Sequence, residues 1–549
     1  MSEPARLQCP AAGELPSAAP CDERQPAGRR TASPPPAGPS PIGRVSLPET
    51  VLHWFGWTFG CFYSTYRLYD VIRRHPDALD AHSSPGWVAG LSVDHCDDEF
   101  EVLIKGQLAT YAVFMTIHLV VGQFLHGMAL NKVVPLFHAL LAAAYLCFTV
   151  GVRRYALLLA VALAMFGSSR LRSRPLSWLL VAVLLLGHQQ LMLAVVGPDL
   201  THDAENRTYL ATVVQMWNLC RAVMFCCDQA DQPPALATHD NVVTFLGFVF
   251  YGPTLQGPLL AHTDYLSSLT AGGVAAGPGW PRLRRLLLSL ARLGGWLLFL
   301  EVSNHVLHYH ALIYSPEDMH RLFGRWEIAG LNYWAGQYFH VKYVVCYGIP
   351  CALASFEGVP TPLPPRCVSW IASYSDMWKY FDHGLYRFMQ RHIYRPLCGA
   401  QPSAGRRMAA SAAVFAFVFA WHGLLPHILV WSVANFVCVT VERAGGRVAS
   451  SRRGREWRRV LGASLRRRCQ ALLLAPLFLV SLVSQAGFLT NSIAVSWLAM
   501  GEGLAPASAC DMLVTLGFMY CGCQVSYDVK RWRQQRARLQ RADSKLKQP

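Results

Sequence analysis

The sequence predicts an all-α membrane protein whose chain crosses the bilayer about ten times. Of its 549 residues, 53% are hydrophobic and only 15% are charged, whereas about a quarter of a soluble protein is charged. Long apolar runs also recur along the chain, and a helix needs about 20 such residues to cross the hydrocarbon core of a bilayer. The two observations together exclude a soluble globular enzyme.

The expected membrane spans differ in clarity. The clearest apolar runs are Leu176–Gly197 and Cys469–Leu489. A shorter run, Tyr155–Phe166, is predicted to be re-entrant or interfacial. Gly257-Pro258 is expected to break a helix inside the membrane, which is tolerated where a cavity is lined. The remaining expected spans are Val51–Tyr66, Gln107–Leu125, Val133–Gly151, Val242–Leu260, Leu293–Ile313, Ile328–Pro350, Met408–Ala420, Ile428–Val441 and Met512–Val525.

The two ends of the chain differ in composition from the membrane domain. Residues 1–44 contain ten Pro and few large apolar side chains, so we expect a disordered segment. They lack the apolar core of a cleavable signal peptide, which makes Val51–Tyr66 the expected first anchor. The membrane domain then covers residues 45–529, with a core at about 240–442, and residues 530–549 form a basic tail.

Positive charge gathers between the apolar runs and gives the expected orientation. The net charge is +16, and much of it lies in Arg443–Arg468 and Lys530–Lys547. Loops of this kind face the cytosol and anionic lipid, so nucleic-acid binding is not expected. Both termini are predicted to be cytosolic. Asp77–Glu101, which contains no Lys or Arg, suits a lumenal loop.

His422 is the first candidate functional residue. It follows the almost wholly apolar Ala412–Ala420, and counting spans back from the basic loop places it in the lumenal half of its helix. An imidazole inside a membrane is costly and is a functional candidate by default. The alternative is a hydrogen bond between helices.

Asp382 lies in a second informative segment, in which Ser373–Gly384 packs aromatic residues around a carboxylate. Arg387 and Arg391 follow at helical spacing. A basic helix face beside a membrane suits the phosphates of CoA. An interfacial helix that binds lipid headgroups is the alternative.

Together these segments resemble the membrane-bound O-acyltransferase (MBOAT) superfamily, in which a polar Asn/Asp-bearing segment precedes a His at the end of an apolar run. Within it, the chain resembles the hedgehog acyltransferases. The likeness covers about Trp296 to Glu442. The matching motifs are Tyr309–Ser315, Val341–Tyr343, Pro365–Ser369, Met377–Asp382, Phe415–Val418, Trp421–Gly423 and Val439–Glu442.

The resemblance implies roles for individual residues. His422 and Asp382 fall on the catalytic His and Asp, and Trp378 falls on a Trp that lines the reaction chamber. Lys379 stands where an Arg is usual, and the Pro253–Pro258 segment looks one residue shorter than in the family. A related non-catalytic branch lacks the His. The expected substrate contacts are Trp378, Lys379, Arg387, Arg391 and Trp421.

The resemblance also implies a reaction. Palmitoyl-CoA, entering from the cytosol, would donate its acyl group to the amino-terminal Cys of a secreted Hedgehog-type protein in the lumen of the endoplasmic reticulum, or of the Golgi. His422 would take the proton from the attacking amine. Asp382 would either position the thioester or hold a relay water. No metal is expected in catalysis. The alternatives are an MBOAT enzyme that acylates a lipid or glycerol hydroxyl, and a non-enzymatic membrane scaffold or transporter.

Cys367 has three interpretations. By the resemblance it falls on a Cys reported to ligate haem, and thiolate ligation of a structural haem b is chemically reasonable. A Cys beside Pro364-Pro365 is equally consistent with a buried thiol or a palmitoylation site.

Overall fold

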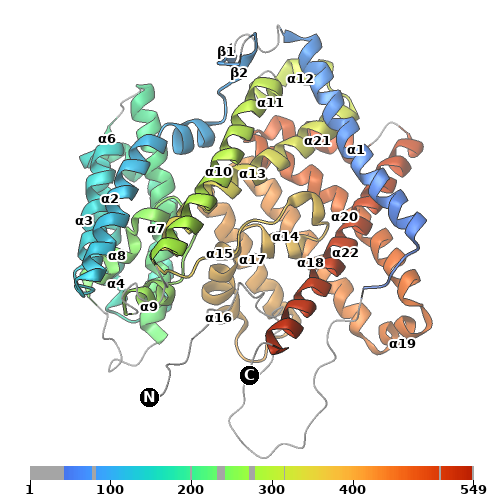
Figure 1. Cartoon of the computed structure of the whole chain (residues 1–549). Helices are drawn as coiled ribbons and strands as arrows, with labels where there is room; N and C mark the ends of the chain where they lie inside the picture. The colour runs from blue at the N-terminus through green and yellow to red at the C-terminus, as the bar shows by residue number, and fades with distance from the viewer. Residues whose placement is uncertain are drawn as a thin grey trace, which may run out of the picture.

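The computed structural model describes residues 42–76, 82–88, 90–197, 201–231, 241–270, 279–314, 316–505 and 508–546. The predicted disordered segment, residues 1–44, lies outside these ranges except for its last three residues. Apart from a short antiparallel pair, in which Ser83 faces Asp94, the regular structure in the described ranges is helical (Figure 1).

The elements follow one another along the chain in the order α1 to α22, with short 3-10 and π segments (η) between some of them. Their bounds are α1 Leu47–Arg74, β1 Ser83–Pro85, β2 Ser92–Asp94, η3 Glu99–Lys105, α2 Leu108–Gly127, α3 Val134–Thr149, α4 Val152–Ser169, α5 Arg174–Leu186, α6 His188–Val196, α7 His202–Asp231, α8 Val242–Val249, η5 Gly252–Thr254, α9 His262–Thr270, α10 Gly279–Val306, α11 Tyr309–Ile313, α12 Pro316–Leu322, α13 Arg325–Phe356, η7 Val368–Trp370, α14 Tyr374–Tyr380, α15 His383–Met389, η8 Gln390–Tyr394, α16 Arg395–Cys398, α17 Ala404–Trp421, α18 Pro426–Ser450, α19 Arg452–Val460, α20 Ala463–Thr490, α21 Ile493–Leu504 and α22 Ala509–Leu546.

Seven of the described helices are long and apolar enough to cross a membrane, or up to nine if each of two bent pairs counts as one span. The all-α polytopic class is therefore confirmed. The number falls below ten partly because α8, inside the expected span Val242–Leu260, has only eight residues. Similarly, α3 has 16 residues.

The run Tyr155–Phe166, expected to be re-entrant or interfacial, lies within a longer helix. The helix α4 covers 18 residues, about 27 Å at 1.5 Å per residue, and is one of the candidate spans. Its first turn contains Arg154, which shortened the apolar run in the sequence. This side chain is buried and donates to Thr208 Oγ1 at 3.0 Å and to the Ala204 carbonyl at 3.1 Å. The polar partners on α7 allow the helix to continue through the charged position.

Two other expected spans are interrupted. The run Leu176–Gly197 forms α5 and α6, which meet at an angle of 60°. The predicted break at Gly257-Pro258 is confirmed, because α8 ends at Val249 and the chain continues irregularly to α9. Gly257 has a φ of 98°, and a Cβ there would lie 3.0 Å from the Trp217 ring. The turn therefore requires glycine.

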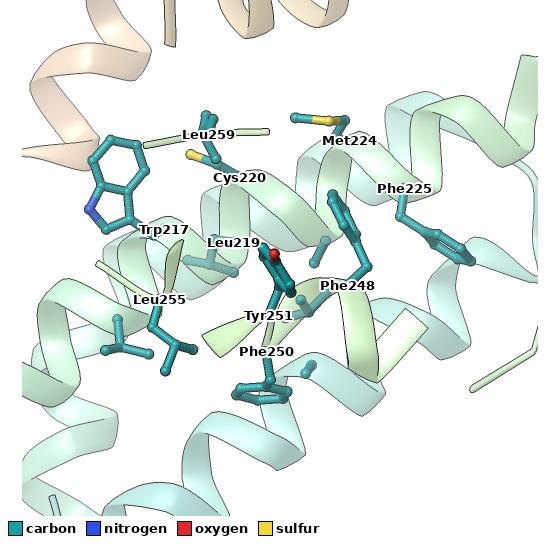
Figure 2. Close-up of a cluster of buried hydrophobic side chains, with 14 of the residues drawn as sticks. Trp217, Leu219, Cys220, Met224, Phe225, Phe248, Phe250, Tyr251, Leu255 and Leu259 are labelled. Carbon is teal, nitrogen blue, oxygen red and sulfur yellow. The ribbon is translucent and has the colours of Figure 1, made fainter. Parts of the chain in front are cut away.

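The helix α13 joins two hydrophobic cores, between which it runs near the centre of the molecule (Figure 1). One core belongs to the lobe formed by α2 to α9, and part of it, around Trp217, Phe248 and Tyr251, is drawn in Figure 2. The other core lies among α1, α13, α20, α21 and α22. Because α13 contributes Tyr347 to the first core and Val345 to the second, it fixes the two lobes relative to each other.

The segment Arg366–Arg395, which contains Asp382, Arg387 and Arg391, forms several short elements from η7 to the start of α16. Leu385, Phe388 and Met389 of α15 are buried. Asp382 lies between α14 and α15, where the chain turns into the interior.

Candidate active site

His422 caps the carboxyl end of α17. Its Nδ1 lies 2.8 Å from the Val418 carbonyl oxygen, and because a carbonyl only accepts, Nδ1 carries the proton. In the neutral ring Nε2 is then the basic nitrogen. Gly423 follows with a φ of 94°, the left-handed conformation in which helices commonly end.

Asp382 caps the amino end of α15, and both of its oxygens accept hydrogen bonds. The Leu385 amide donates to Oδ1 at 2.8 Å, as expected for an N-cap residue. The Tyr347 hydroxyl of α13 donates to Oδ2 at 2.7 Å. The carboxylate is therefore held between two elements.

The two predicted catalytic residues line one cavity of about 140 Å³, here called the inner cavity. His422 and Asp382 reach it from different helices, so the fold brings together residues that are distant in the sequence. Trp431 and Phe488 stack beside His422 with ring centroids 4.1 Å apart. The full lining is Gly336, Phe339, Tyr343, Tyr347, Val368, Tyr374, Met377, Trp378, Phe381, Asp382, Leu385, Met389, Trp421, His422, Trp431, Asn435, Ser481, Gln485, Phe488 and Leu489. A few polar groups in an aromatic wall suit an acyl thioester.

The two predicted Trp residues of the inner cavity are fixed by hydrogen bonds. Trp378 Nε1 donates to Asn435 Oδ1 at 2.8 Å, and Trp421 Nε1 donates to the Met216 carbonyl at 3.0 Å. Asn435 was not singled out in the sequence, because an Asn inside the apolar run Ile428–Val441 gives no sign of what it faces. Both indoles thus keep their rings against the cavity.

A second cavity, here called the outer cavity, has a volume of about 510 Å³ and shares Asp382 and Tyr347 with the inner one. Arg282, Arg285 and Arg292 of α10 line it. On the other side lie the last turns of α13 and residues 358–364, and His383 and Gly384 complete the wall. The carboxylate of Asp382 therefore stands where a cationic cavity meets an aromatic one.

The basic residues predicted to bind the CoA phosphates line neither cavity. Arg391 instead donates to Asp228, a buried carboxylate of α7, at 2.8 Å. Lys379 places its ammonium 5.0 Å from the centre of the Tyr380 ring. Arg387 belongs to the same short helix as the buried Leu385 and Phe388.

Cys367 precedes η7, and its thiol lies 3.8 Å from Gln337 Oε1, to which it donates. It lines neither the inner nor the outer cavity. Haem ligation by Cys367 stays a prediction, and acyl transfer needs no redox chemistry.

Comparison with known proteins places this geometry in a family. The family model described as MBOAT, membrane-bound O-acyltransferase family, matches residues 173–482, more than half of the chain. The chain belongs to this family. The predicted family resemblance is thus confirmed, and the match encloses His422, Asp382 and the three arginines of the outer cavity.

Three curated relatives differ in how much they share with the chain. The protein-cysteine N-palmitoyltransferase Rasp of Drosophila melanogaster is 32% identical over 337 residues, which are 58% of this chain and 62% of the fly protein. The protein-cysteine N-palmitoyltransferase HHAT of Mus musculus is 28% identical over 401 residues, 69% of this chain and 78% of the mouse protein. The membrane-bound O-acyltransferase GUP1 of Millerozyma farinosa is 20% identical over 302 residues, 54% of this chain and 56% of the yeast protein.

Proposed function

We propose that the chain is a protein-cysteine N-palmitoyltransferase, which moves palmitoyl from palmitoyl-CoA to the amino-terminal Cys of a secreted Hedgehog-type protein. The observation that carries the proposal is the convergence of His422 and Asp382 on the inner cavity in a member of an acyltransferase family. The names of the fly and mouse relatives support the acyl donor and the cysteine acceptor.

The outer cavity binds the CoA moiety in this proposal. Arg282, Arg285 and Arg292 offer guanidinium groups that pair with phosphate oxygens. The thioester then lies at Asp382 and Tyr347, where the two cavities meet, with its carbonyl carbon toward His422. Asp382, held by Leu385 and Tyr347, positions the thioester or a relay water.

Transfer proceeds by attack of the acceptor's neutral amine on the thioester carbonyl carbon. His422 Nε2 takes the proton that the amine loses. The tetrahedral intermediate collapses, the carbon–sulfur bond breaks, and the CoA thiolate receives the proton from His422. The products are the amide and free CoA. A route that first acylates the acceptor's thiol and then shifts the acyl group to its amine uses the same two residues.

The proposed orientation brings the two substrates from opposite sides. The basic loop Arg443–Arg468 and the basic carboxyl-terminal segment Lys530–Lys547 face the cytosol under the positive-inside rule. If α18 and α17 both cross the membrane in this orientation, the outer cavity lies on the cytosolic side and His422 lies toward the lumen. We place the enzyme in the endoplasmic reticulum membrane with both termini cytosolic.

A second candidate keeps the fold and changes the acceptor. The similarity to GUP1 favours an O-acyltransferase that modifies a lipid or glycerol hydroxyl. His422 would then take the proton of an alcohol, which makes the acceptor the deciding observation.

The test uses the full chain in detergent with radiolabelled palmitoyl-CoA and a peptide bearing a free amino-terminal Cys. His422→Ala should lower turnover about 10²–10⁴-fold, as expected on removal of a general base. His427→Ala is the matched control, because this buried histidine lies five residues away and does not line the inner cavity. A peptide with an acetylated amino terminus should not form the amide.

Each outcome selects one function. A labelled peptide and an inactive His422→Ala variant support the proposal, whereas full activity of that variant would overturn it. Labelling of added lipid with an unlabelled peptide would select the O-acyltransferase. Labelling of neither would leave a non-enzymatic scaffold.

A further inference from the structure

A second cluster of chemically active side chains lies outside the inner cavity. His118 of α2, His138 of α3 and Glu357, directly after α13, come from three separate elements and are at most 3% exposed. One potential ligand atom from each of the three residues lies within 4.8 Å of the other two. Three groups of metal-ligating type are thus brought to one buried point.

Hydrogen bonds within the described residues leave part of this cluster unsatisfied. His118 Nε2 donates to Glu357 Oε2 at 3.1 Å, and the Tyr251 hydroxyl donates to the same oxygen. Yet His118 Nδ1, His138 Nε2 and Glu357 Oε1 are buried and have no hydrogen-bond partner. Buried polar atoms are nearly always paired with a protein group or an ordered water, and these three belong to residues whose ligand-type atoms meet at one place.

The protonation of His138 suits a metal ligand. Its Nδ1 lies 3.1 Å from the Tyr265 hydroxyl. When Nδ1 donates to this oxygen, Nε2 is the nitrogen that keeps a lone pair. Metal-binding histidines almost always use their other nitrogen in this way, which fixes the tautomer and the ring.

Two glycines pack closely against the unpaired atoms, where a larger residue would crowd them. A Cβ at Gly252 would lie 3.3 Å from His118 Nδ1, and a Cβ at Gly122 would lie 3.1 Å from Glu357 Oε1. Beyond them the surroundings are apolar, as Figure 2 shows for Tyr251 among Leu219 and Phe248. A buried carboxylate in such a place is costly unless a cation or a hydrogen-bonded partner compensates it.

We propose that His118, His138 and Glu357 bind one divalent transition-metal ion, with Zn²⁺ as the preferred ion. Two imidazole nitrogens and a carboxylate oxygen are a donor set that Zn²⁺ commonly takes. The ion compensates the negative charge of Glu357 and is coordinated by atoms that otherwise have no partner. Its role is structural, because neither histidine lines the inner or the outer cavity.

The site would brace the wall of the outer cavity. Glu357 lies between Phe356 and Gly358, both of which line that cavity. An ion held at Glu357 therefore ties the end of α13 to α2 and α3. This connects the α2–α9 lobe to the helix that carries Tyr347.

The experiment measures metal content, which is independent of any acyl transfer. The full chain, purified in detergent without added metal, should contain about one Zn²⁺ per chain by elemental mass spectrometry. After chelation it should take up one Co²⁺ and show the visible absorption of a low-symmetry Co²⁺ site. His138→Gln and Glu357→Gln should lose both signals, whereas His392→Gln, a buried histidine elsewhere, should keep them.

A readout on the unaltered chain guards against variants that fail to fold. Chelation should lower the melting temperature of the wild type, and Zn²⁺ should restore it. The proposal is overturned if the wild type neither carries Zn²⁺ nor takes up Co²⁺, as expected for a simple His118–Glu357 ion pair. The proposal is also overturned if monodisperse His138→Gln protein still binds one equivalent of Zn²⁺ or Co²⁺. Absence of palmitoyl transfer by the wild type would count against the proposed function and would not affect the metal-site proposal.

Discussion

The inner and outer cavities meet at Asp382 and Tyr347 but differ in lining and in how visible they are in the sequence. The inner cavity is aromatic, and its His422, Asp382, Trp378 and Trp421 were all predicted. The outer cavity is lined by arginines of α10 that were not. A lone imidazole in an apolar run is conspicuous because its burial is costly. Arginines at the end of a span look like any loop that obeys the positive-inside rule.

Among the changes considered below, the largest effect is expected at Asp382, where the inner and outer cavities meet. Asp382→Asn should lower kcat about 10²-fold or more, the scale expected for a group that stabilises or relays charge in the transition state. Asn also caps helices, so α15 should persist and palmitoyl-CoA should still bind. The measurement is single-turnover acyl transfer together with the Kd for a non-hydrolysable acyl-CoA.

The matched control for this change is Asp376→Asn. Asp376 lies six residues earlier, pairs with Lys530 at 2.9 Å, and does not line the inner cavity. Normal turnover of Asp382→Asn would show that Asp382 has no role in the reaction and that its position between the cavities only contributes to packing.

The next effect tests the outer cavity. Arg285→Gln combined with Arg292→Gln should raise the KM for palmitoyl-CoA about 10–100-fold, because a hydrogen bond to a charged group contributes roughly 1.5–3 kcal/mol. The kcat should change little, since the proposed catalytic residues His422 and Asp382 line the inner cavity. For the wild type, KM should rise with ionic strength as salt screens the phosphates.

Arg284→Gln is the control, because Arg284 belongs to the same turn of α10 and does not line the outer cavity. Equal effects of the control and the double variant would show that CoA responds to the net charge of the helix and not to the cavity.

The fold class could be predicted because it depends on composition and run length, which the sequence displays directly. The helix boundaries could not be predicted where a polar residue inside a helix forms hydrogen bonds with residues distant in the sequence. Arg154 limited the predicted apolar run. In the structure it lies inside α4 and donates hydrogen bonds to Thr208 and to the Ala204 carbonyl of α7. The non-helical conformation at Gly257-Pro258 was predicted correctly, because glycine and proline both disfavour a helix interior.

The candidate site likewise contains residues that the sequence identifies and residues whose role depends on the fold. His422 and Asp382 stand out by chemistry and by motif. The value of Tyr347 arises only from its contact with Asp382, 35 residues away, and within Ile328–Pro350 it reads as one aromatic among several. Arg391 had the spacing of a phosphate-binding face, but the fold directs it to Asp228.

A smaller effect tests whether Tyr347 acts through Asp382. Tyr347→Phe removes one hydrogen bond of about 1 kcal/mol, so kcat/KM should fall about fivefold. In the Asp382→Asn background the same change should add little, because contacting residues that act as a unit are not additive. Kinetics of the four variants of this cycle provide the measurement, with Tyr386→Phe as a control outside both cavities. Full additivity would mean that Tyr347 contributes independently of Asp382.

The smallest expected effect sets the sequence-based assignment of CoA contacts against the structural one. Lys379→Ala should change the KM for palmitoyl-CoA less than about twofold, because its ammonium lies over the Tyr380 ring and lines neither cavity. An exposed or half-exposed cation–π contact contributes only about 0.5–1 kcal/mol, and none of it reaches the outer cavity. The measurement is KM beside that of Arg292→Gln under identical salt. If Lys379→Ala raises KM as much as Arg292→Gln, the CoA phosphates lie along α14, and the outer cavity is not where the donor binds.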